Sequence, residues 1–248
     1  MCNNKRAIML GVAAVAAGMS GVAMGGVVVD LTTPGSSGFV RGALYMSVDT
    51  EGVGDPVSSF LRFRTDLTSP QGYNSSARPL RFNEDDQGDY TRNLRVSELP
   101  MFNIGGVDYF EFLFNANEPD GQGVDRVSIN QMNIYTGPIG DKRTNSISSL
   151  GTLRYSLDAT GDDNTIIVRD ANSGENAMDA RILVPVAMFG DASPDDYVYL
   201  FARIGDTATA QGSYEEFGVR VLPVVIPLPS AAGLGMAGLA GLAFRRRR

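Results

Sequence analysis

The chain has 248 residues, 43% of them hydrophobic, and a formal net charge of −7, with no histidine, no tryptophan and one cysteine. The absence of histidine excludes histidine-assisted nucleophiles and histidine-containing zinc sites. The length is enough for one sizeable β-domain, and the acidic balance argues against nucleic acid as a partner.

The first 25 residues have the three parts of a secretory signal peptide. Two basic residues come first, an apolar stretch (7–19) follows, and small residues at 23–25 suit signal peptidase. Cys2 precedes the apolar stretch, whereas a lipoprotein signal carries its cysteine after it. We therefore predict that signal peptidase removes residues 1–25, and that the exported protein begins near Gly26 without cysteine or disulfide.

Residues 26–222 alternate apolar and polar side chains with a period of two, which is typical of half-buried strands. The clearest runs are 109–114, 150–157, 165–168 and 196–204. Clusters of Gly, Asp and Asn separate the runs, and no segment of this body shows an apolar stripe at helical spacing. We expect one all-β domain, an antiparallel β-sandwich of nine to eleven short strands, either jelly-roll or immunoglobulin-like.

The body is more acidic than the whole chain. Six of the 21 basic residues lie in the terminal segments and none of the 28 acidic residues does, which leaves 15 against 28, a net charge of −13. Such a charge suits a secreted protein, or one that holds divalent cations. Calcium takes six to eight oxygen ligands, but Asp, Asn and Gly are also ordinary turn residues. We favour turns, and keep a structural Ca²⁺ as the alternative at Asp120, Asp125, Asp158, Asp162 and Asp163.

Two further groups of residues suggest chemistry on sugars. Tyr197 and Tyr199 share one face of a predicted strand and could stack on a glycan, although aromatic strand faces are common without any ligand. Glu215 and Glu216 are the most tempting carboxylate pair for glycoside hydrolysis. Adjacent strand residues point to opposite faces, so the two cannot flank one glycosidic bond. We predict no catalytic residue and no enzymatic activity.

The C-terminal segment, 223–248, has three parts. A short proline motif, Ile226-Pro227-Leu228-Pro229-Ser230, leads into an uncharged run of small and apolar residues, 231–244. The run stops at Arg245, Arg246, Arg247 and Arg248. As a helix the run can enter a bilayer, while the four arginines hold the end in the cytoplasm. From Ser230 the run has fifteen residues, short against the roughly twenty of a spanning helix, so we predict a transient transmembrane helix, with a plain anchor as the alternative.

This order of motif, apolar helix and arginine block resembles the PEP-CTERM sorting signal of Gram-negative bacteria, in the variant that reads Val-Pro-Leu-Pro-Ala. Pro227 and Pro229 match its two prolines, Ile226 stands for the valine, and Ser230 stands for the small residue. Leu228 replaces the glutamate of the commonest form. The resemblance implies that an exosortase, a membrane protease of the cysteine type, cuts near the motif and releases the protein from its helix.

A second resemblance covers about 107–221. It is carried by the blocks 110–112, 128–135, 150–158, 182–189, 196–201 and 213–219, which are similar to a block found in many PEP-CTERM exported proteins. The usual ending there is Gly-Phe-Glu-Glu-Trp, so Tyr214 and Phe217 are aromatic replacements. This resemblance implies a surface or matrix role and supplies no catalytic residue.

Taken together, these features predict an exported protein that passes through the inner membrane and ends at the cell surface or in the extracellular biofilm matrix. Its expected partners are signal peptidase and an exosortase. The leading hypothesis is a non-enzymatic structural or interaction role. The alternatives are a glycan-binding module of the exopolysaccharide matrix and a carboxylate-based glycoside hydrolase.

Overall fold

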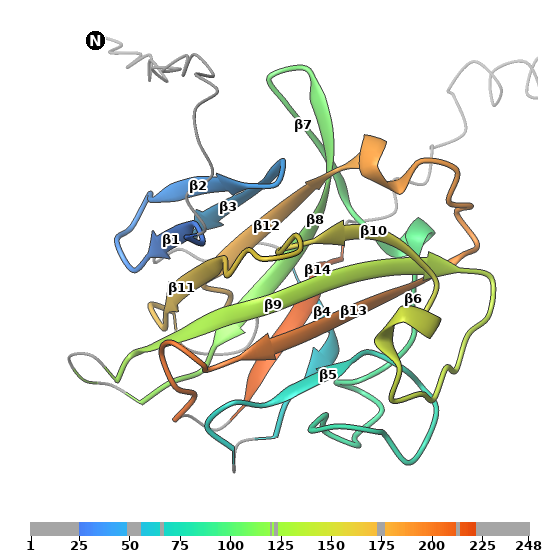
Figure 1. The fold of residues 1–248 in the computed structure, drawn as a ribbon, viewed down its shortest axis with the longest axis horizontal. Helices are drawn as coiled ribbons and strands as arrows, with labels where there is room; N and C mark the ends of the chain where they lie inside the picture. Colours follow the sequence, from blue (N-terminus) through green and yellow to red (C-terminus); the bar gives the residue numbers. More distant parts are fainter. Residues whose placement is uncertain are drawn as a thin grey trace, which may run out of the picture.

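The protein is all-β in the part of the chain that the structure, a computed structural model, describes: residues 25–48, 56–64, 67–119, 121, 124–172, 177–211 and 214–221. Those residues form fourteen strands in two sheets and three single-turn 3₁₀ helices, with no α-helix among them (Figure 1). Within these ranges no helix is long and apolar enough to cross a membrane. The predicted sorting tail lies outside the described residues, as does the predicted signal peptide except Gly25.

Sheet A has the strand order β1-β11-β9-β13-β5, with β10 paired to β9 and β6 paired to β13. Its strands are β1 (Val28–Leu31), β5 (Gln71–Tyr73), β6 (Leu94–Arg95), β9 (Arg126–Gly137), β10 (Thr152–Ser156), β11 (Thr165–Arg169) and β13 (Tyr197–Ile204). Every pair is antiparallel except β1 with β11, which is parallel. The two long strands β9 and β13 form the centre of the sheet.

Sheet B has the order β2-β3-β12-β8-β14-β4, with β7 paired to β8, and all its pairs are antiparallel. Its strands are β2 (Ser37–Val40), β3 (Ala43–Ser47), β4 (Val57–Arg62), β7 (Met101–Ile104), β8 (Val107–Ala116), β12 (Ala180–Pro185) and β14 (Glu215–Arg220). The 3₁₀ helices are η1 (Val96–Glu98), η2 (Ile147–Ser149) and η3 (Val186–Phe189).

One apolar core lies between the sheets. Phe112 and Phe114 of β8 are fully buried in it together with Leu200 of β13. As the period of two predicted, alternate residues of β13 from Val198 to Ile204 all point into this core. Burying such side chains is worth about 1.5 to 3 kcal/mol each, so this core is the main source of stability.

A second, aromatic layer covers the outer face of sheet A. Its buried members are Tyr73, Tyr135, Leu150, Tyr199 and Phe201, and Phe82, Ile147 and Tyr197 pack against them. The rings meet edge to face, with centroids 6.3 Å apart for Tyr73 and Tyr199 and 5.8 Å apart for Phe82 and Phe201. The part of sheet A formed by β5, β9 and β13 is therefore covered on both faces, and Tyr73, Tyr135, Tyr199 and Phe201 are buried there.

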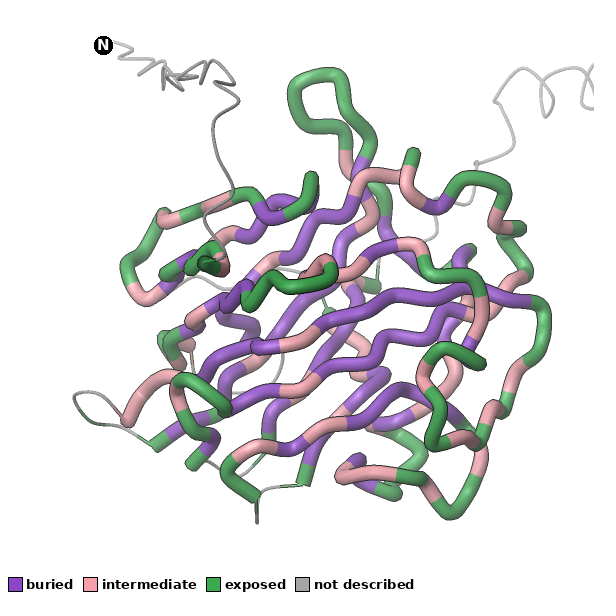
Figure 2. The backbone as a smooth tube through the Cα atoms, in the orientation of Figure 1, coloured by how far each residue is buried: buried purple, intermediate pink, exposed green. Residues whose placement is uncertain are grey.

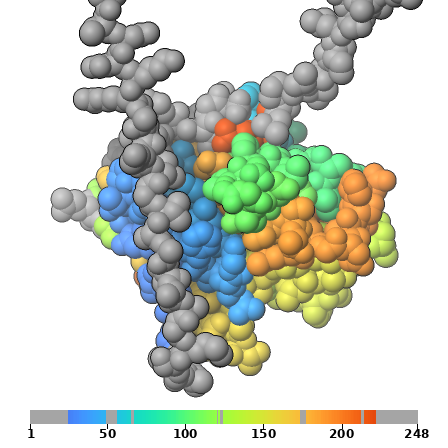
Figure 3. Space-filling view, turned by 90° about the horizontal axis from the view of Figure 1, so that it is seen from above, coloured from blue at the N-terminus to red at the C-terminus, as the bar shows by residue number. Residues whose placement is uncertain are grey.

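The β7–β8 hairpin projects from the body. Gly105 and Gly106 make its two-residue turn with φ of +60° and +86°, a conformation that glycine adopts without strain. Met101, Ile104 and Val107 on this hairpin are exposed apolar side chains. Figure 2 shows the arm as largely exposed, and from above it forms a green knob on the surface (Figure 3).

The expected class, all-β with mainly antiparallel sheets, is confirmed, but the expected nine to eleven strands are too few. The structure places fourteen strands in its described residues. Several of the extra ones are only two to four residues long, as in β5 and β6. A strand of two to four residues is too short to show an alternating pattern, because the alternation repeats every two residues.

Candidate functional site

Tyr199 does not form an exposed platform for a glycan, which corrects the sequence-based expectation. Its side chain is fully buried in the aromatic layer. Its hydroxyl donates to the Ile139 carbonyl at 2.9 Å and accepts from the Lys142 amide at 3.3 Å. Burial raises its pKa to about 12, so the phenol remains neutral. Tyr199 therefore anchors the segment after β9 and has no free face for a sugar.

Tyr197 is half-buried and its ring is already in contact with protein. The Arg95 guanidinium lies 4.3 Å from the ring centroid and donates to the hydroxyl at 2.8 Å. Gly140 packs so closely that a Cβ there would lie 2.6 Å from Cζ of the ring. The two tyrosines thus hold connecting segments onto sheet A, and a glycan role for them would require those segments to move away.

Asp125, one of the possible calcium ligands, is paired with arginines. Its carboxylate accepts from Arg169 Nε at 2.8 Å, and Arg126 Nε lies 3.8 Å away. Two guanidinium groups already supply the positive charge that a cation would bring. Asp120, its expected neighbour in the site, lies outside the described residues.

The turn containing Asp158, Asp162 and Asp163 uses carboxylates to hold its own backbone. Asp158 accepts from the Asn164 amide at 2.8 Å, and Asp162 accepts from the Ala159 amide at 3.2 Å. Burial raises the pKa of Asp158, and so do the negative charges of Asp163 and Asp162. The hydrogen bond from the Asn164 amide acts in the opposite direction. These contacts are those of an aspartate-rich turn.

The described ranges contain no group of three or more His, Cys, Asp or Glu side chains arranged to hold a metal ion. The calcium hypothesis therefore gains no support from the geometry of these turns. It stays an untested prediction, because part of the proposed ligand set lies in undescribed residues.

Glu215 and Glu216 point to opposite faces of β14, as predicted. Glu215 is 3% exposed and faces the interior, while Glu216 accepts from Ser59 Oγ at 3.1 Å on the other side. Burial, together with the neighbouring Glu118 carboxyl group, raises the pKa of Glu215. The sequence gives no sign of this nearness, since 97 positions separate the two glutamates and neither stands in a recognisable motif.

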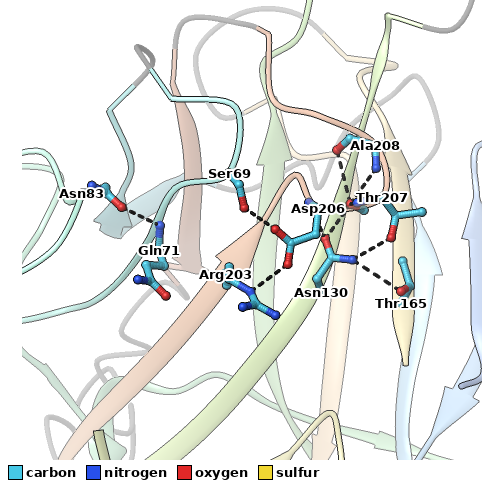
Figure 4. A network of polar contacts seen from close by, with 10 residues as sticks. Ser69, Gln71, Asn83, Asn130, Thr165, Arg203, Asp206, Thr207 and Ala208 are labelled. Atoms are coloured by element: carbon cyan, nitrogen blue, oxygen red, sulfur yellow. Dashed lines mark hydrogen bonds and ion pairs between the residues drawn. The ribbon is translucent and has the colours of Figure 1, made fainter. Parts of the chain in front are cut away.

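A polar network fixes the segment that follows β13 (Figure 4). Asn130 accepts from the Asp206 amide at 2.9 Å and donates to Thr207 Oγ1 at 2.8 Å. Asp206 also accepts from Ser69 and forms an ion pair with Arg203 at 2.8 Å. These contacts satisfy the polar groups of a connecting segment, which is a structural role.

Two adjoining clefts follow the β4 edge of sheet B. The first, of about 410 Å³, is lined by Arg92, Glu98 and Arg220 among others, and the second, of about 370 Å³, by Ser59, Asp89, Tyr90 and Glu216. Ser58 lines both. Each cleft combines hydroxyl and charged groups, and no sequence motif signals either one, because their walls come from three distant parts of the chain.

The sorting motif and arginine block, residues 226–230 and 245–248, lie outside the described residues. Comparisons of the chain with protein-family models, curated proteins and solved structures found no match. The fold defines this chain as a two-sheet all-β protein over its described residues.

Proposed function

We propose that this chain is an exported cell-surface or matrix protein with a structural or interaction role, delivered by a PEP-CTERM-type sorting tail. The observation that carries the proposal is the order of segments in the sequence: a secretory signal, a β-rich body and a proline motif followed by an apolar run and four arginines. The apolar run can insert into the membrane, and the four arginines hold the end of the chain in the cytoplasm.

The body is compatible with this role. The exposed apolar side chains of Met101, Ile104 and Val107 stand on a projecting hairpin, where another molecule can reach them. Exposed apolar groups that gather in one place often mark interaction sites. We further propose that the two sheets, which enclose one apolar core, form a β-sandwich.

Fractionation of cells that produce variants of the tail tests the proposal. Replacing both Pro227 and Pro229 by alanine removes the rigid extended geometry that a protease cleft would read. The variant is expected to accumulate uncleaved in the inner membrane. Pro223→Ala, a proline replacement just upstream of the motif, is the matched control and is expected to mature normally. Normal maturation of the double variant would contradict the proposal.

Glycan binding in the clefts along β4 is the second candidate function. The supporting observation is the cleft lined by Ser58, Ser59, Asp89 and Glu216. Tyr90 also lines it, with the Arg62 guanidinium 3.2 Å from the centroid of its ring. Hydroxyl and carboxylate groups match the hydrogen-bonding capacity of sugar hydroxyls. Asp89 and Glu216 also supply the two carboxyl groups that glycoside hydrolysis requires, so the same cleft is where the hydrolase alternative is tested.

Retention on the polysaccharide of the producing cell distinguishes these functions. If the cleft binds glycan, Tyr90→Ala and Glu216→Gln are expected to weaken retention, while Tyr197→Phe leaves it unchanged. Release of shorter saccharides that stops in Glu216→Gln would instead indicate hydrolysis. Equal behaviour of all variants would exclude the cleft as the glycan site.

A further inference from the structure

Basic side chains without an ion-pair partner gather in one place on this acidic body. Most arginines of the described residues pair with an Asp or Glu. Within the described ranges, the bases that form no such pair are Arg78, Arg81, Arg95, Lys142 and Arg143. Arg95 stacks on a tyrosine ring, and the other four lie in the connecting segments 74–83 and 138–150. These two segments hold four bases and a single acid, Asp141.

Direct contacts join the two segments into one surface. Arg143 Nε donates to the Pro79 carbonyl at 2.8 Å, and Ser75 Oγ donates to the Lys142 carbonyl at 2.8 Å. Arg81 follows Pro79 by two residues. Three of the four bases are exposed and Lys142 is half-buried, and together they form the basic patch: Arg78, Arg81, Lys142 and Arg143.

The aromatic layer of sheet A holds this patch in place. The Tyr199 hydroxyl accepts from the Lys142 amide at 3.3 Å, and the Tyr73 hydroxyl accepts from the Thr144 amide at 2.7 Å. These two anchored amides flank Arg143 in the sequence. Tyr199, which the sequence suggested as a glycan contact, thus positions the segment that carries two of the bases.

Arg78 is fixed by neutral groups. Its Nε donates to the Asp86 carbonyl at 2.8 Å, and its Nη1 and Nη2 donate to the carbonyls of Ser75 and Thr91 at 2.8 and 2.7 Å. Carbonyl oxygens satisfy these donors without supplying a negative charge, and an arginine in a protein is always ionised. A full positive charge therefore stays in a fixed position at the surface.

We propose that the basic patch binds an acidic polysaccharide through the carboxylates of its sugar units. Guanidinium groups match carboxylates in charge and in geometry. Because charges are screened over about 10 Å at 0.1 M salt, a single flexible chain lying on the patch interacts mainly with its bases. A membrane or a nucleic-acid duplex would bring many more negative charges against the surrounding acidic surface, which repels them. The site is separate from the clefts along β4 and does not depend on the sorting tail.

Titration of the full-length protein with oligogalacturonate, a chain of carboxylate-bearing sugars, tests the patch. The wild type is expected to bind it, and the double variant Arg81→Gln with Arg143→Gln is expected to bind at least about tenfold more weakly, because two charge-assisted contacts are lost. Arg41→Gln with Arg169→Gln removes the same charge from two half-exposed arginines outside the patch, and is expected to bind as the wild type does. Absence of binding by the wild type, or equal affinities of the two double variants, would overturn the proposal.

Methyl-esterified oligogalacturonate supplies a test that needs no protein variant. The ester keeps the sugars and lacks the negative charges, so the wild type is expected to bind it at least about tenfold more weakly than the acid. Raised salt is expected to weaken binding of the acid and to leave binding of the ester unchanged. Equal affinity of the wild type for ester and acid would contradict recognition through carboxylates.

Other partners for the patch are distinguished by the same double variant, Arg81→Gln with Arg143→Gln. Phosphatidylserine vesicles, duplex DNA and a second copy of the protein are expected to show no association that this variant abolishes. Association with one of them that exceeds binding to oligogalacturonate, and is lost in the variant, would assign the patch to that partner instead. Loss of oligogalacturonate binding in Tyr90→Ala, with the patch variant unaffected, would place the glycan site in the clefts along β4, and would overturn this inference while leaving the proposed function intact.

Discussion

At the scale of single residues, the most consequential charge is that of Glu111. Its carboxylate is fully buried on β8 and accepts from Arg181 at 2.6 Å and from Arg220 at 3.0 Å. The Phe102 ring lies about 5 Å from both guanidinium groups. This arrangement compensates a charge that would otherwise be costly to bury.

Glu111→Gln is expected to lower the free energy of unfolding by about 3 kcal/mol, since it leaves two partly buried arginines facing each other without their counter-ion. Asp86→Asn, which removes the half-exposed partner of Arg64, should cost at most about 1 kcal/mol. Urea unfolding of both variants checks the contrast. Similar losses in the two would show that Glu111 contributes no more than a surface ion pair.

Tyr199 gives a second prediction at this scale. Tyr199→Phe removes the hydroxyl that binds the Ile139 carbonyl and the Lys142 amide, and should reduce stability by about 1 kcal/mol. Tyr214→Phe, at a more exposed ring, is the control and is expected to be neutral. If Tyr199→Phe abolished glycan retention without loss of stability, the assignment of this side chain to packing would be wrong.

At the scale of elements, the hairpin of β7 and β8 is held in shape by its turn. Gly106→Ala forces a side chain into a backbone with φ of +86° and is expected to cost about 1 to 2 kcal/mol. Gly88→Ala adds a Cβ in open space and should change stability by no more than about 0.5 kcal/mol. Faster hydrogen exchange in β7 of Gly106→Ala, with the rest of the body unchanged, would locate the effect.

The same elements show what the sequence could predict. Strands β8 and β13 were predictable, because each is eight or more residues long and alternates regularly between core and outer face. The parallel pairing of β1 with β11 was not, since it joins residues 137 apart and no local pattern encodes it. The burial of Tyr199 was missed for a similar reason: the segment after β9 that covers it has no regular period.

Among the candidate sites, the opposite orientation of Glu215 and Glu216 was predictable from strand geometry alone. The nearness of Glu118 to Glu215 was not, because it depends on how the segment after β8 lies against the start of β14. The clefts beside β4 likewise exist only after residues near positions 58, 90 and 216 have come together.

At the scale of the whole molecule, the net negative charge of the body makes calcium binding a hypothesis to test. If its aspartates serve as turn residues, thermal midpoints with calcium and with chelator should coincide at matched ionic strength, because Asp125 and Asp158 already have partners. A bound ion at a hundred times its dissociation constant would add about 2.7 kcal/mol, which a melting curve readily detects. Such a shift, absent for magnesium, would restore the calcium hypothesis.

The central proposal is that the chain is exported and loses its tail, and the intact mass of the protein recovered from the cell surface tests it most directly. The expected form begins near Gly26 and ends before Arg245, with neither the apolar run nor the arginine block. Recovery of surface protein that still carries Arg245 to Arg248 would contradict the proposal, and would make the C-terminal segment a permanent anchor instead.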